Sequence, residues 1–221
     1  MPFTVTSSGA NAAAGQAVTL TLTIPANSIV GVSCSSNATS VGTHGTCVDS
    51  NSNAYSYGSL FIANNQLVET FYTLNSGPSA TTLTYTQASG QSYFGGTIIA
   101  AWILTATGAI SVGGSGAGLF SANAPTTTNG ITTGNLSITS SDGIVLGLAN
   151  DFNGAHLTIG TVPLMVSDGN TVSGTWFYWA HAAVTASSPA TFTCSTLNDT
   201  VIVGGIAFQA GGTILMGQAC L

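Results

Sequence analysis

The chain contains few residues that could do acid–base chemistry. Its 221 residues include six acids and no lysine or arginine. Glycoside hydrolysis normally needs two carboxylates flanking the bond, yet Glu69 is the only glutamate and has no acidic neighbour. The other acids stand in turn-like sequences, where Asp closes turns through its own backbone: Asp49, Asp142, Asp151, Asp168 and Asp199. We therefore expect no catalytic carboxylate pair and no enzyme.

The three histidines offer a second kind of chemistry. A nucleophilic triad needs a Ser or Cys beside a His and an acid. His44, His156 and His181 are present, but no G-x-S-x-G nucleophile elbow is. His44 lies in the loop-like GTHGTC, and His181 follows a strand-like aromatic run. These contexts favour loop and packing roles.

One turn-like segment resembles the start of a calcium loop. Asp49, Asn51 and Asn53 carry oxygen-bearing side chains at alternate positions. The bidentate glutamate that would complete the loop is absent. Two interpretations stay open: a calcium site completed by distant loops, and a pair of Asx turns. No other cofactor is expected, because the cysteine and histidine spacings match no zinc motif.

The four cysteines are Cys34, Cys47, Cys194 and Cys220. An even count permits two disulfides in three pairings. Cys34 and Cys47 are the nearest pair in sequence, which would leave Cys194 to pair with Cys220. Disulfides would imply maturation outside a reducing cytosol, as in a released particle. The alternative is four reduced, buried thiols.

Four aromatic residues are adjacent: Trp176, Phe177, Tyr178 and Trp179. Alternation along a strand puts Trp176 and Tyr178 on one face and the other two on the opposite face. We expect one pair to fill the core. For the other pair, core packing, a subunit interface and stacking on a sugar all remain open.

The absence of Lys and Arg excludes several partners. Nucleic-acid and phosphate recognition depend on those side chains, so we expect no nucleic-acid partner. No apolar run reaches the roughly 18 residues that span a bilayer, so we expect no membrane insertion. The first thirty residues lack the basic and apolar regions of a signal peptide, which predicts cytoplasmic synthesis.

Apolar and polar residues alternate along most of the chain, which is typical of half-buried strands. Expected strands include 3–8, 17–24, 67–74, 93–104, 134–140, 143–150, 175–184 and 200–209. Turn-forming Asn, Gly, Ser and Pro separate them, a pattern that favours a β-sandwich or barrel. We predict an all-β, antiparallel β-sandwich of jelly-roll or concanavalin A-like type. It would be one domain over residues 1–221, with a Gly/Ser/Thr-rich connection at 111–130 and no internal repeat.

The order of these segments resembles the concanavalin A-like (lectin/glucanase-type) β-sandwich domains of phage and bacterial surface proteins. The matching pieces lie between about 17 and 210 and include SIVGVSCS, DSNSNAYSY, LVETFYTLNSGPSATTLTYT, FGGTIIAAWIL, TTGNLSITSSDGIVLGLANDFNG, GTWFYWAHAAV and VIVGGIAFQAG. The resemblance implies a sandwich with a sugar-binding, hydrolytic or structural role. Glucanase members carry an E-x-D-x-x-E type strand, whereas here Glu69 stands alone, which removes the catalytic implication.

These observations predict a non-enzymatic structural virion protein, a phage capsid decoration or head-fibre component on the outer surface of the particle. Its partners would be other virion proteins and further copies of itself. The alternatives are a carbohydrate-binding receptor or tail-spike module that takes neutral glycans, and an extracellular filament subunit.

Overall fold

The computed structural model describes residues 3–38, 43–63, 66–88, 93–120, 131–151, 157–160, 163–172, 175–194 and 201–211. These ranges contain sixteen strands and no helix. Accordingly, no helix in them is long and apolar enough to cross a membrane. Every strand pair is antiparallel, and the prediction of an all-β, antiparallel β-sandwich is confirmed.

The first eight strands form one unit, which we call unit 1. They are β1 (Phe3–Ala14), β2 (Ala17–Ile24), β3 (Ile29–Ala38), β4 (Thr46–Asp49), β5 (Ser56–Ala63), β6 (Gln66–Thr73), β7 (Ala80–Thr86) and β8 (Tyr93–Ala106). Five of them make a large sheet in the order β1-β8-β3-β6-β5, and three make a small sheet in the order β2-β7-β4.

The remaining eight strands form unit 2. They are β9 (Ile110–Phe120), β10 (Ile131–Thr132), β11 (Gly143–Asp151), β12 (Leu157–Ile159), β13 (Val166–Val172), β14 (Thr175–Val184), β15 (Thr191–Cys194) and β16 (Val201–Ala210). The large sheet has the order β9-β16-β11-β14-β13 and the small sheet the order β10-β15-β12. Adding eight to each strand number of unit 1 therefore reproduces unit 2, and the chain is built from two topological repeats.

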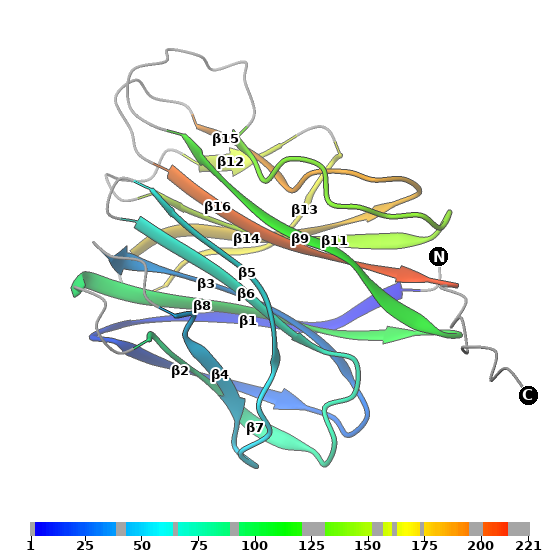
Figure 1. The fold of residues 1–221 in the computed structure, drawn as a ribbon, viewed down its shortest axis with the longest axis horizontal. Helices are drawn as coiled ribbons and strands as arrows, with labels where there is room; N and C mark the ends of the chain where they lie inside the picture. The colour runs from blue at the N-terminus through cyan, green and yellow to red at the C-terminus, as the bar shows by residue number, and fades with distance from the viewer. Residues whose placement is uncertain are drawn as a thin grey trace, which may run out of the picture.

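The four sheets are stacked in four layers (Figure 1). The two large sheets lie in the middle, and each small sheet covers the outer face of one of them. An apolar core fills each of the three spaces between layers. The central core holds large side chains from both units, including Trp102, Leu146, Phe177 and Phe208.

Strand β2 shows how the sequence builds a layer. Its residues AVTLTLTI alternate, and Val18, Leu20 and Ile24 are buried while the threonines between them are mostly exposed. Alternation with a period of two places the apolar residues on one face. The small sheet of unit 1 therefore covers the large sheet with an apolar inner face and keeps a hydroxyl-rich outer face.

The two units meet in a nearly two-fold arrangement. Strand β3 packs against β11 at the centre, β1 lies beside β13, and β5 lies beside β9. If each strand is replaced by its equivalent in the other unit, the β1–β13 contact becomes the β9–β5 contact. Contacts that are exchanged in this way are typical of an isologous interface. The symmetry is only partial, because β16 also packs against β3 and β6 while, among the described strands, β8 makes no comparable contact with β11 or β14.

Equivalent strands share register as well as order. In unit 1, Ile29-Val30 stands opposite Leu104-Ile103, and in unit 2 Ile144-Val145 stands opposite Phe208-Ala207. In both units the first residue of each pair faces the central core and the second faces the outer core. The segments TIIAAWILTA (97–106) and VIVGGIAFQA (201–210) are therefore structurally equivalent, a repeat that the sequence analysis missed.

Two expectations about connections are corrected. Residues 111–120, expected in a long connection, belong to β9 and pair with β16; residues 121–130 lie outside the described residues. The predicted strand at 134–140 is not a strand, although Leu136 forms an isolated bridge with Ser188. Its residues bond to the 187–188 turn and to the side chain of Gln209, and not to the backbone of a neighbouring strand. The apolar alternation there therefore reflects packing without a strand ladder.

Candidate functional site

The single glutamate is buried inside unit 1. Glu69 lies on β6, is fully buried, and faces the space between the large and small sheets, like its neighbour Phe71. Its Oε1 accepts a hydrogen bond from the backbone N–H of Gly45 at 2.8 Å, and its Oε2 accepts one from the hydroxyl of Tyr85. A buried carboxylate with two donors satisfies its hydrogen-bonding needs without solvent.

The segment beside this carboxylate fits only because it contains a glycine. A Cβ at Gly45 would lie 2.5 Å from the carbonyl oxygen of Thr86 and 2.8 Å from Glu69 Oε2. The adjacent His44 is exposed and stacks on Tyr57, with ring centroids 4.2 Å apart. An exposed aromatic pair therefore lies one residue away from a buried acid.

Burial dominates the electrostatics of this cluster. It raises the pKa of Glu69, although the hydrogen bonds from Tyr85 and Gly45 and the nearby His44 act in the opposite direction. The pKa of Tyr85 is also raised, first by burial and then by the charge of Glu69. The partners of Glu69 are a phenol and a backbone amide rather than a second carboxylate, so this is not the paired arrangement of a glycosidase.

Two of the predicted disulfide residues lie in the same core. Cys34 on β3 stands opposite Glu69, and Cys47 on β4 stands opposite Tyr85. Both are buried free thiols, and burial raises the pKa of each. The expected Cys34–Cys47 disulfide is therefore corrected: both residues point into the same core from opposing sheets, but their thiols are free. Cys220 and the side chain of Cys194 lie outside the described residues.

A second cluster joins the two units. The indole Nε1 of Trp102, on β8, donates a 2.8 Å hydrogen bond to Oδ2 of Asp168, on β13. His181, on β14, places Nδ1 2.8 Å from the same oxygen. Asp168 was expected in a turn, but it is the extra residue of a bulge between Ser167 and Gly169. Bulges redirect side chains, and this one turns a carboxylate toward the opposite unit.

The Asp168–His181 contact has the orientation found in a triad, with the acid on Nδ1. A triad also needs a nucleophile on Nε2, and the described hydrogen bonds of His181 involve Asp168 alone. The cluster therefore serves as a polar tie across the central core. It joins residues 66 positions apart, and nothing in the local sequence signals that pairing.

The aromatic run divides between two cores. Phe177 and Trp179 lie in the central core with ring centroids 5.5 Å apart, and Tyr178 is half-buried on the opposite face against the outer core of unit 2. The burial of Phe177 and Trp179 removes the sugar-stacking option for that pair. The side chain of Trp176 lies outside the described residues.

The calcium-like segment forms a hydrogen-bonded turn. Oδ1 of Asp49 accepts the backbone N–H groups of Asn51 and Asn53 at 2.8 and 3.0 Å, and Nδ2 of Asn53 lies 3.0 Å from Oδ2. Asn51 donates its side-chain amide to the carbonyl of Ser79 at 2.9 Å. Each carboxylate oxygen thus meets N–H donors, as in Asx turns. Among the described residues, no three Asp, Glu, His or Cys side chains gather as metal ligands.

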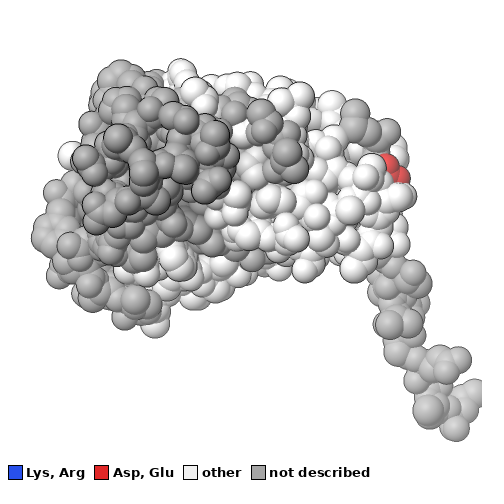
Figure 2. Space-filling view, turned by 90° about the horizontal axis from the view of Figure 1, so that it is seen from above, with Lys and Arg blue, Asp and Glu red and all other residues white. Residues whose placement is uncertain are grey.

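The remaining predicted candidates lie apart from these clusters. Asp142 is in an exposed turn before β11, and Asp151 is buried at the end of β11. His156 and Asp199 lie outside the described residues. On the described part of the face seen in Figure 2, acidic side chains show only as a small patch near one edge. No protein-family model matches the chain, and no curated protein matches it by sequence.

Proposed function

We propose that this chain is a non-enzymatic structural protein of a virus particle, a capsid decoration or head-fibre component that acts through contacts between subunits. The observation that carries the proposal is that three of the acidic side chains have structural roles. Asp49 closes a turn, Glu69 lies inside a core, and Asp168 ties the units together. With no Lys or Arg in the sequence, the surface offers neighbours mainly neutral polar and apolar groups.

The strand arrangement supports this proposal. Each unit has eight antiparallel strands in two sheets, with β1-β8-β3-β6 and β2-β7-β4 or their equivalents side by side. We propose a jelly-roll type for each unit, a class that includes viral capsid and lectin domains. The hydroxyl-rich outer face of β2 suits a protein with only six charged side chains in 221 residues.

The same class includes lectins, so binding of neutral glycans is the alternative that needs a direct test. Phe177 and Trp179 are buried, so a glycan site would have to use other residues. Specific binding on a glycan array would favour a receptor or tail-spike module over a structural component.

The proposal is tested by locating the chain. Particles released from cells that express it would be purified, labelled intact with gold-conjugated antibodies against the chain, and imaged. We expect label on the outer surface and the chain in stoichiometric amount by mass spectrometry. Recovery of the chain only in the soluble fraction, without label on particles, would overturn the proposal.

A further inference from the structure

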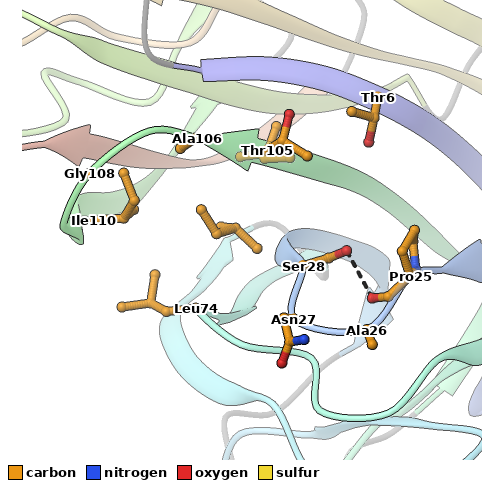
Figure 3. A pocket seen from close by; sticks show the side chains of 12 residues that line it. Thr6, Pro25, Ala26, Asn27, Ser28, Leu74, Thr105, Ala106, Gly108 and Ile110 are labelled. Carbon is orange, nitrogen blue, oxygen red and sulfur yellow. Dashed lines mark hydrogen bonds between the residues drawn. The ribbon is translucent and has the colours of Figure 1, made fainter.

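A cavity of about 500 Å³ opens where the two units are joined. Its walls come from β1, the turn between β2 and β3, the end of β6, the end of β8, and the link from β8 to β9 (Figure 3). The volume is within the usual range of ligand sites. No ionisable side chain lines it; the lining is Thr6, Pro25, Ala26, Asn27, Ser28, Ile29, Leu74, Leu104, Thr105, Ala106, Gly108 and Ile110.

One wall is held rigidly before anything binds. Oγ of Ser76 accepts the backbone N–H of Ser28 at 3.0 Å and donates to the carbonyl of Pro25 at 2.8 Å. Asn27 donates its backbone N–H to Gly77 at 3.0 Å, and Ser28 donates its hydroxyl to Pro25 at 2.8 Å. A preformed site avoids the entropy cost of ordering its own walls on binding.

The chemistry of the lining selects an aliphatic, uncharged occupant. Ile29 and Leu104 are buried at the cavity, and Leu74 is 40% exposed there. The hydroxyl groups of Thr6 and Ser28 are already bonded to backbone carbonyls, which leaves the exposed side chains of Asn27 and Thr105 for hydrogen bonds with an occupant. No aromatic ring lines the cavity, so a sugar would have no stacking surface.

The chain itself presents a group of this kind. Leu164 lies just before β13 and Val166 begins it. They are 71% and 53% exposed, the highest values among the exposed large hydrophobic residues that the structure describes. They are two residues apart and therefore point to the same side where the chain is extended. Together they form a small exposed aliphatic protrusion, and covering it would remove apolar surface from water.

The repeat shows that the two units differ at both places. At the positions in unit 1 that correspond to Leu164 and Val166, counted back from the start of β5 as from the start of β13, the smaller residues Ala54 and Ser56 stand. The connection in unit 2 equivalent to the β2–β3 turn contains the acid Asp142. Among the described residues, unit 1 therefore contributes a neutral pocket and unit 2 an aliphatic protrusion.

We propose that the cavity receives Leu164 and Val166 of a second copy of this chain. Copies with a net charge of −6 and no Lys or Arg repel one another, so they associate best through surfaces without ionised groups. The nearest acid to the protrusion in sequence, Asp168, is already held by Trp102 and His181. The pocket and protrusion are different surfaces, so the contact is head-to-tail and extends into rings or filaments. This inference rests on the proposed structural function and names its partner.

The test uses the full chain and sedimentation velocity over a range of concentrations. A double variant, Leu164→Ser with Val166→Ser, removes the protrusion, and Ala26→Trp fills the pocket. We expect each change to weaken self-association about tenfold or more, as expected from the loss of buried aliphatic area. Leu164→Ile is the control for the protrusion, and Ala186→Trp, at another exposed turn, is the control for added bulk.

Mixing the two variants gives the decisive result. The protrusion-free variant keeps its pocket, and the pocket-filled variant keeps its protrusion, so the mixture should form one-to-one pairs and nothing larger. A monomeric wild type, variants that assemble as the wild type does, or a mixture that stays monomeric would overturn the inference. Antibody labelling of particles, which does not depend on self-association, reports separately on the structural function.

Discussion

Trp102 and Asp168 form a hydrogen bond across the boundary between the two units, with the indole nitrogen 2.8 Å from the carboxylate oxygen. The bulge in β13 is what allows it, because Asp168 has no partner position in β14 and turns toward unit 1. The bond stands at the edge of an otherwise apolar core. It therefore fixes the lateral position of one large sheet on the other, which non-directional apolar contacts do poorly.

Replacing Trp102 with Phe should destabilise the protein measurably. The change removes a hydrogen bond to a charged acceptor, which typically contributes about 1.5–3 kcal/mol, and leaves space in the central core. Equilibrium denaturation followed by circular dichroism would measure the loss. Tyr178→Phe is the control, since it removes only an exposed 2.8 Å hydrogen bond with Asn170; equal losses for the two variants would contradict the structural role of Trp102.

Glu69 should make the protein less stable as pH rises. Burial raises its pKa above the ordinary 4.5 in the folded protein, so the folded state binds the proton more tightly than the unfolded chain. The stabilisation is complete below about pH 4.5 and is lost as pH rises through the folded pKa. Glu69→Gln should flatten this dependence in denaturation curves measured from pH 4 to 8.

The control for Glu69 is Asp142→Asn, which removes an exposed carboxylate. A Glu69→Gln protein whose pH dependence matches the wild type would show that the buried carboxyl does not control it.

Gly45→Ala should disrupt the same cluster by overpacking. The added methyl group would meet a backbone carbonyl at 2.5 Å, and backbone cannot move aside as a side-chain tip can. We expect a loss of about 1–3 kcal/mol in the free energy of unfolding. Gly9→Ala provides the comparison, because its nearest neighbour would be a leucine methyl at 3.5 Å, and a tolerated Gly45→Ala would argue against the tight fit.

Cys34 and Cys47 should resist alkylation in the folded protein. Both are buried, and burial raises the pKa of each thiol, so little reactive thiolate is present. Iodoacetamide labelling with peptide mass spectrometry should modify them only after denaturation, and without any reductant. A requirement for reductant would show that they are oxidised instead.

The sequence analysis predicted individual strands well where one face is buried. The expected strand at 17–24 coincides with β2, because threonine alternates there with Val18 and Leu20. It also identified Asp49 as a turn residue, since an Asx turn is set by residues two to four positions away. Both features depend on neighbours in sequence, which is why local patterns reveal them.

Features that depend on distant neighbours were not predictable in this way. The repeat is hidden because equivalent residues need only be apolar and face the same core: Trp102 and Ile206 both lie in the central core, as do Ile29 and Ile144. The local sequence VSDGN predicts that Asp168 lies in a turn. Its actual role, a hydrogen bond across the unit boundary, depends on the bulge and on a tryptophan from the other unit. The pocket likewise combines four separate stretches of the chain.

The link between the units, residues 107–109, is short and exposed. The units are held together by the central core and by the Trp102–Asp168 hydrogen bond, and the link keeps them at a high effective concentration for that contact. The link also fixes their ratio: every chain delivers one unit 1 and one unit 2, so their different surfaces are always present in equal numbers.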